Sequence, residues 1–111
     1  MMSKKSMSTL ERISFGEYVR SLRGKANLPL RKVAAELNID TSTLSKIEKN
    51  ERNANEQIID GISRMFKIDQ SELKVRYISD KITNQLLNEE DGLEILKIVE
   101  KKIKYYRRKK T

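Results

Sequence analysis

The segment 41–49 carries the side chains with the clearest capacity for chemistry. Its apolar residues, Leu44 and Ile47, are spaced to form one inner face of a helix. The opposite face would carry only hydrogen-bonding side chains: Thr41, Ser42, Ser45, Lys46 and Lys49. Hydroxyl groups donate and accept hydrogen bonds and ammonium groups donate them, so this face is suited to recognising polar and anionic groups.

The composition excludes several classes of catalysis. The chain has no Cys and no His, which removes disulfides, thiolate zinc sites, cysteine nucleophiles and every mechanism that needs an imidazole. The cluster Glu89, Glu90 and Asp91 is better explained by helix-start acids at a turn than by a metal site, because no further ligand lies at a useful spacing. We therefore expect no enzyme, no metal and no cofactor.

Charge and length narrow the class further. The 111 residues carry a formal charge of +8, which makes a polyanionic partner plausible because basic side chains release counterions when they neutralise phosphates. This length suits one compact domain plus an extension. No apolar run approaches a membrane span and the first residues lack the apolar stretch of a signal peptide, so we expect a cytoplasmic protein without membrane contact.

Two helices must position the 41–49 segment. The box Ser14-x-x-Glu17 predicts a helix that begins after Ser14 and ends near residue 25. A second helix begins at Pro29 and has an inner face of Val33, Ala34 and Leu37. Between this helix and the next, Asn38 suits a left-handed turn, Ile39 would point into the core, and Asp40 could cap the amides of the helix over 41–49.

Further helices follow a polar loop over 50–55. Ile58, Ile59, Ile62, Met65 and Phe66 predict a fourth amphipathic helix that closes the core. Asp69-x-x-Glu72 is a second capping box, after which helical periodicity continues, and a last helix begins near Asp91 and ends in a strongly basic run.

The string LPLRKVAAELNIDTSTLSKIEKNER resembles the Cro and repressor class of helix-turn-helix proteins, also called the XRE family, over roughly residues 15–66. The resemblance rests on Val33-Ala34, Asn38-Ile39 and Ser45-x-Ile47-Glu48 taken together. It implies an all-α fold: a compact four- to five-helix domain with a C-terminal helical extension. We expect a basic arm over 1–13, the DNA-binding domain over 14–70 and the extension, with its basic tail, over 71–111.

The resemblance also implies roles for individual residues. In this family the third helix lies in the major groove of double-stranded DNA and reads base edges, a task that maps here onto Thr41, Ser42, Thr43 and Lys46. Phosphate contacts map onto the rim of that helix, with some backbone amides: Arg31, Lys32, Lys49, Arg52 and Asn53. Arg23 and Glu48 match a structural ion pair of relatives. The chain departs from the family at Pro29-Leu30, where a capping Ser or Thr and a Gln are usual.

The extension carries an apolar stripe that one small domain does not need. We expect it to form a homodimer through Val75, Ile78, Ile82, Leu86, Leu93, Leu96, Val99 and Ile103. Two alternatives remain open: the stripe folds back onto the core of its own chain, or it binds another protein.

Two hypotheses about function follow. The first is a homodimeric transcription regulator on a palindromic operator, similar to the small regulators encoded beside bacterial DNA methyltransferases and so a restriction-modification controller. The second is an antitoxin-like protein whose extension binds a partner while the N-terminal domain binds DNA. Two further DNA contacts remain open: Lys4 and Lys5 in the minor groove, and residues 101–110 on the DNA backbone.

Overall fold

The structure, a computed structural model, describes residues 12–110, apart from the side chain of residue 110, so the expected arm lies almost wholly outside the described residues. Within this range every regular element is a helix. In chain order they are α2 (Phe15–Lys25), α3 (Leu30–Glu36), α4 (Thr41–Glu48), α5 (Glu56–Phe66), α6 (Gln70–Leu86) and α7 (Gly92–Lys110). The predicted all-α fold with a C-terminal helical extension is thus confirmed. None of the described helices is long and apolar enough to cross a membrane.

Helix α2 begins with the predicted capping box. The Ser14 hydroxyl accepts a hydrogen bond from the Glu17 amide at 3.1 Å, and the Ser14 amide donates to the Glu17 carboxylate at 3.0 Å. Asp69 acts similarly before α6, where its carboxylate accepts from the Glu72 amide. Asp40 does occupy the N-cap of α4, but the expected side-chain cap is wrong, because its exposed carboxylate makes no capping hydrogen bond.

Three helices end in the same Schellman motif, each with an asparagine in the left-handed conformation. Asn27, Asn38 and Asn50 follow α2, α3 and α4 with φ of 56°, 59° and 63°. After α3, the Asn38 amide donates to the Ala35 carbonyl and the Ile39 amide to the Ala34 carbonyl, which satisfies carbonyls that the helix leaves unpaired. Asparagine tolerates this conformation better than most residues, and the sharp turn between α3 and α4 depends on it.

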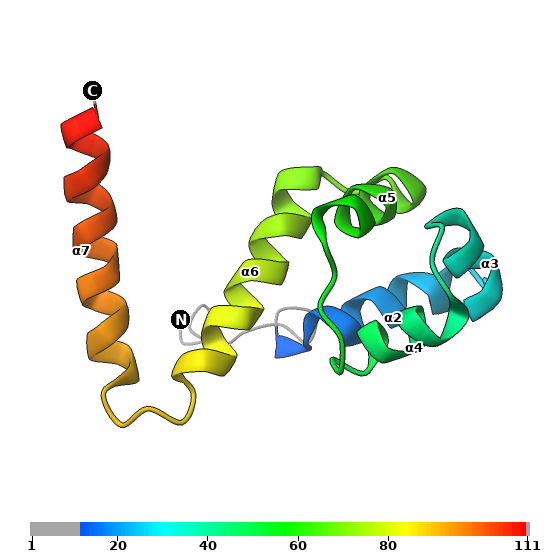
Figure 1. Cartoon of the computed structure of the whole chain (residues 1–111), viewed down its shortest axis with the longest axis horizontal. Coiled ribbons are helices and arrows are strands. Elements are labelled where there is room, and N and C mark those ends of the chain that lie inside the picture. The colour runs from blue at the N-terminus through cyan, green and yellow to red at the C-terminus, as the bar shows by residue number, and fades with distance from the viewer. Residues whose placement is uncertain (1–11, 111) are drawn as a thin grey trace, which may run out of the picture. The chain divides into compact units, whose positions relative to one another are not determined.

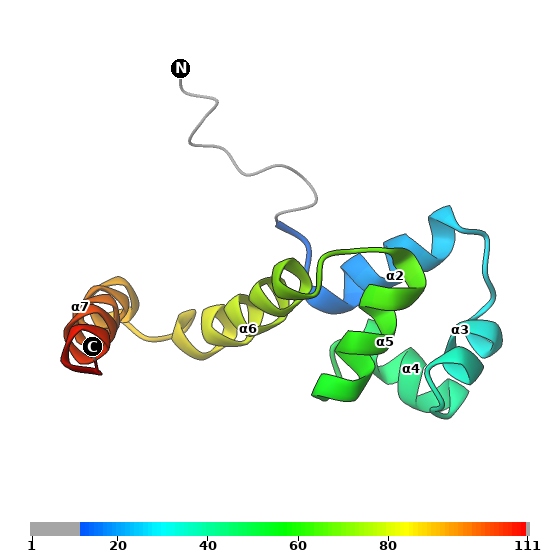
Figure 2. The same ribbon diagram turned by 90° about the horizontal axis from the view of Figure 1, so that it is seen from above.

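The core lies between these short helices. Val19, Val33, Leu44 and Ile62 are fully buried, and α4 packs against both α2 and α3 (Figures 1 and 2). Ala34 is buried as well, so a small side chain stands where α3 approaches α4. The sequence periodicity therefore identified the residues that fix the orientation of α4.

The compact domain includes the start of α6. Leu73 is fully buried, and the Tyr77 ring meets the Phe15 ring edge-on at 4.8 Å between centroids. The Tyr77 hydroxyl also accepts a hydrogen bond from the Ala54 amide at 3.1 Å. The first compact unit ends at Tyr77, beyond the expected boundary at residue 70. The boundary lies inside a continuous helix, where sequence patterns give no signal.

The second compact unit begins at Ile78 and consists of the end of α6, a turn and α7. Gly92 makes the tight turn between the helices possible, because a Cβ atom there would lie 2.7 Å from the Leu86 carbonyl oxygen. The two helices therefore approach each other closely where they are joined.

Candidate nucleic-acid interface

Helix α4 presents its polar face to solvent because its other face is locked into the core. Leu44, Ile47 and Glu48 are buried. On the opposite side Thr41, Ser42 and Lys46 are exposed, while Thr43 is half-buried. The hydroxyls of the first turn and the ammonium group one turn later thus share an accessible surface of the domain, which is the arrangement that the sequence indicated.

Exposed basic side chains lie on α3 and just after α4. Arg31 and Lys32 are exposed at the start of α3, and Lys49 and Arg52 are exposed just after α4, together with Asn53. The positive charge comes from two segments that are separated in sequence and joined by the packing of α3 against α4.

Sequence reasoning missed Arg20. This exposed arginine of α2 lines a small recess of about 170 Å³ with Ser45 of α4 and with Lys49, which follows α4. Only the packing of α2 on α4 brings Arg20 next to Lys49, and nothing in the spacing of the first helix indicates that neighbour. The recess adds a further cation beside the exposed face of α4.

Arg23 and Glu48 form the expected ion pair. Arg23 donates from Nε to one Glu48 oxygen at 2.8 Å and from Nη2 to the other at 3.0 Å. The side chains are 17% and 5% exposed, so water screens the pair only partly. These hydrogen bonds raise the pKa of Arg23, more than burial lowers it. The pair joins α2 to the end of α4.

Asn50 is a second structural link that sequence reasoning did not identify. Its side-chain oxygen accepts from the Gly16 amide at 3.1 Å, and its side-chain nitrogen donates to the Ser14 hydroxyl at 2.7 Å. Gly16 lies so close to the end of α4 that a Cβ atom would be 2.4 Å from the Ile47 carbonyl oxygen. Polar contacts therefore attach both ends of α2 to the C-terminal end of α4.

The residues expected to form a dimer are not part of the core. Leu86 is half-buried, and the other seven are exposed, from 40% at Ile82 and Val99 to 79% at Leu93. None of the eight belongs to the buried core cluster, so they do not enlarge it. Among the described residues, all the exposed large hydrophobic side chains lie between Val75 and Tyr106.

The acidic residues Glu89, Glu90 and Asp91 are exposed. No group of three or more potential metal-ligating residues is brought together within residues 12–110. These carboxylates lie at the turn between α6 and α7.

Comparison with known protein families matches residues 19–73 to the family described as Helix-turn-helix. No curated protein and no solved structure matches the chain. The matched residues include α3, the Asn38 turn and α4, which are the two helices and the turn of the motif. Residues 19–73 therefore form a helix-turn-helix domain of the Cro/repressor, or XRE, type, and this match supports a DNA-binding transcription regulator.

Proposed function

We propose that the chain binds DNA sequence-specifically as a homodimer, with one α4 in the major groove of each half of a palindromic operator. The observation that carries this proposal is the exposed polar face of α4, held outward by the burial of Leu44 and Ile47. A single such helix reads only a few base pairs, and a dimer doubles the sequence that is read. A two-fold axis in the protein then requires a palindrome in the DNA.

Lys46 is the strongest candidate for a base contact. Its ammonium group can donate to O6 and N7 of guanine, whereas the hydroxyls of Thr41, Ser42 and Thr43 both donate and accept and so discriminate less sharply. Lys46 and Ser42 are exposed one helical turn apart on α4, which suits contacts to neighbouring base pairs.

The flanking cations would hold the phosphates. Lys49 and Arg52 stand at the C-terminal end of α4, and Arg31 and Lys32 stand at the start of α3. We add Arg20 to this set, because it lies beside Lys49 in the same recess. Asn53 remains a candidate for a phosphate hydrogen bond. Contacts of this kind fix the position of the protein on the duplex without reading its sequence.

Selection of binding sites from a random DNA pool at near-physiological salt tests the proposal. A palindrome whose half-sites are about one helical turn, or roughly 34–36 Å, apart is the expected result. Enrichment of a single, asymmetric half-site would contradict the dimer, and no enrichment at all would contradict sequence-specific binding.

The resemblance to regulators encoded beside DNA methyltransferases supports a narrower proposal, control of a restriction-modification locus. Inspection of the neighbouring genes is the test. A locus without a methyltransferase or nuclease gene would contradict it.

The exposed apolar side chains between Val75 and Tyr106 favour one alternative, an antitoxin-like protein whose extension binds another protein. Sedimentation of the purified chain distinguishes the two. A monomer whose extension remains exposed favours the antitoxin-like alternative, whereas a dimer that buries the extension favours the homodimeric regulator.

A further inference from the structure

Charge is separated along α7 and the turn before it. The first part of this segment is acidic, with Glu89, Glu90, Asp91 and Glu94 and no basic residue among 89–96. Residues 101–110 contain no acidic residue, and their basic side chains are Lys101, Lys102, Lys104, Arg107, Arg108, Lys109 and Lys110. Lys97 and Glu100 balance each other between the two ends. Helix α7 is therefore negative where it begins and positive where it ends.

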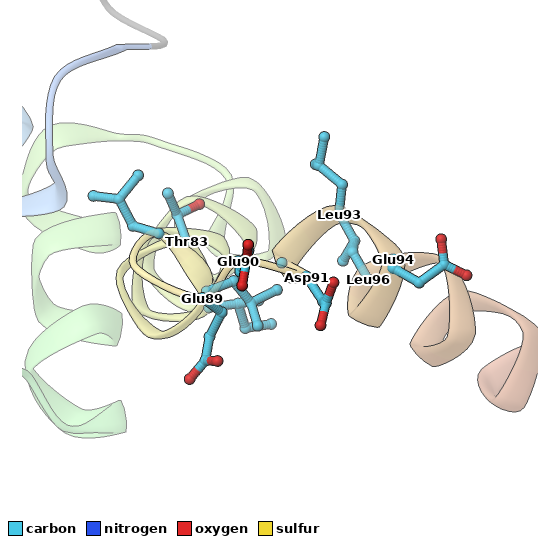
Figure 3. Close-up of a pocket in the computed structure, with 11 residues that line it drawn as sticks. Thr83, Glu89, Glu90, Asp91, Leu93, Glu94 and Leu96 are labelled. Atoms are coloured by element: carbon cyan, nitrogen blue, oxygen red, sulfur yellow. The ribbon is translucent and has the colours of Figure 1, made fainter.

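The acidic end contains a pocket (Figure 3). It has a volume of about 440 Å³ and lies where α6 turns into α7. Apolar residues from α6, the turn and α7 line it, namely Ile82, Leu86, Leu87, Leu93 and Leu96. The acidic residues Glu89, Glu90, Asp91 and Glu94 also line it. The pocket thus suits an apolar or aromatic group that is accompanied by positive charge.

The other end of α7 has that chemistry. Tyr105 and Tyr106 are exposed and pack edge-on, with ring centroids 5.2 Å apart, and Lys109 lies over the Tyr105 ring. Val99, Ile103 and Tyr106 line a second recess of about 360 Å³ with Lys102 and Arg107. Aromatic and aliphatic side chains are therefore interleaved with cations.

The chain cannot bring its own basic end to its own acidic pocket. Helix α7 begins at the pocket with Gly92 and runs without interruption to Lys110. At 1.5 Å per residue, Arg107 lies about 22 Å along the helix from that start. A rigid helix cannot fold back over this distance, so the basic end that fits the pocket must come from another molecule.

We propose that α7 pairs antiparallel with α7 of a second copy, so that the basic, aromatic end of each helix lies against the acidic pocket of the other. This inference rests on the proposed homodimer and defines its interface. In the antiparallel arrangement each acidic end faces a basic end. In a parallel arrangement residues 101–110 of both copies would lie side by side, within the Debye length of about 8 Å over which like charges repel.

The apolar residues of α7 supply the seam. Leu96, Val99, Ile103 and Tyr106 recur at spacings of three and four residues, the pattern by which two helices pack side by side. All four are exposed in the single chain. Two antiparallel helices are related by a two-fold axis, which matches the symmetry required by a palindromic operator. The apolar seam would stabilise the dimer, and the charges would determine that its two α7 helices run antiparallel.

Spin labels on single cysteines test the direction directly, because the chain has no cysteine of its own. Lys97→Cys lies near the middle of α7 and Arg107→Cys near its end, and both positions are exposed. When Asp91 of one helix lies opposite Arg107 of the other, the labels are about 6 Å apart along the axis at position 97 and about 24 Å apart at position 107. A parallel dimer gives short distances at both positions and would overturn the proposal.

Cysteine cross-linking provides a second readout. Under mild oxidation, a mixture of Asp91→Cys and Arg107→Cys chains should form the mixed disulfide dimer in preference to either self-linked dimer. Self-linked Arg107→Cys dimers as the main product would contradict the antiparallel arrangement. A chain that sediments as a monomer would instead contradict the proposed homodimer itself, so the two failures are distinguishable.

Charge reversal tests whether the opposite charges of the two ends of α7 stabilise the antiparallel dimer. Replacing Glu89, Glu90 and Asp91 with Lys should weaken dimerisation roughly tenfold or more, because three attractive pairs with the basic end of the partner helix become repulsive. Replacing Arg107, Arg108 and Lys109 with Glu in the same chain should restore it, because the two ends are again opposite in sign. Failure of this second triple change to restore affinity would overturn the electrostatic assignment.

Discussion

Arg23 of α2 and Glu48 of α4 form a bidentate ion pair, with nitrogen–oxygen distances of 2.8 and 3.0 Å. Arg23 also donates from Nη1 to the Leu28 carbonyl at 3.1 Å, so one guanidinium group holds both the end of α4 and the chain that leaves α2. The exposed face of α4 takes its direction from contacts of this kind beneath it, and not from the residues that would touch DNA.

Glu48→Ala should destabilise the domain by about 2–3 kcal/mol, because it leaves the Arg23 charge partly buried without a partner. This value lies between the losses typical of a fully buried pair and of an exposed one. Urea unfolding measures it. The control is Lys74→Gln, which removes the exposed pair with Glu56 and should cost no more than about 0.5 kcal/mol. Equal losses for the two variants would show that Arg23 and Glu48 contribute no more than a surface pair.

Gly16→Ala and Gly24→Ala should change stability in opposite directions, although both glycines lie in α2. At Gly16 a Cβ atom would meet two carbonyl oxygens of α4 within 2.5 Å, so we expect a loss of about 2 kcal/mol or more. At Gly24 nothing lies within 4 Å, so the higher helix propensity of alanine should add about 0.5–1 kcal/mol. Thermal unfolding of both variants checks this, and a stable Gly16→Ala protein would contradict the close approach of α2 and α4.

Asn50→Gly should destabilise the domain by about 1–3 kcal/mol, because it removes the two hydrogen bonds to Gly16 and Ser14. The matched control is Asn27→Gly at the equivalent position after α2. Glycine adopts the left-handed conformation without strain at both positions, so this backbone effect is common to the two variants. Unfolding free energies separate the two effects. If Asn27→Gly lost as much as Asn50→Gly, the side-chain hydrogen bonds of Asn50 would not be the cause.

Truncation should locate the end of the DNA-binding domain. A chain that ends at residue 80 keeps Leu73 and Tyr77 in place and should give a cooperative unfolding transition. A chain that ends at residue 67 lacks both, and loss of a buried leucine alone costs about 2–5 kcal/mol, a large part of the stability of a small domain. Circular dichroism during heating measures both. A stable, cooperative 1–67 fragment would show that the start of α6 is dispensable.

Lys46→Ala and Arg52→Ala should affect DNA binding differently although each removes one positive charge. Lys46→Ala should weaken the selected operator by about 1–3 kcal/mol and leave random DNA little changed, if Lys46 reads a base. Arg52→Ala should weaken all sequences to a similar extent and flatten the salt dependence. Titrations at several salt concentrations check both, and equal losses on operator and random DNA for Lys46→Ala would make Lys46 a phosphate contact.

The sequence alone determined the helices of the domain and the residues that face its core. Apolar residues at helical spacings of three and four identified Leu44, Ile47 and Ile62, and the residue types at caps and turns identified Ser14 and Asn38. These are local properties, since periodicity, capping and left-handed turns involve residues only a few positions apart. The exposed face of α4 follows from them, because the polar side chains of an amphipathic helix lie opposite its buried ones.

Only the tertiary structure decided which distant residues meet. Arg20 beside Lys49, Asn50 bonded to Gly16, and Tyr77 packed on Phe15 each join segments more than twenty residues apart, and no local pattern encodes such pairs. The same holds for the extension. Its apolar stripe was visible in the sequence, but an amphipathic helix has the same pattern whether it covers its own core or another molecule. The exposure of that stripe, and the acidic pocket at the turn before α7, appear only when the chain is folded.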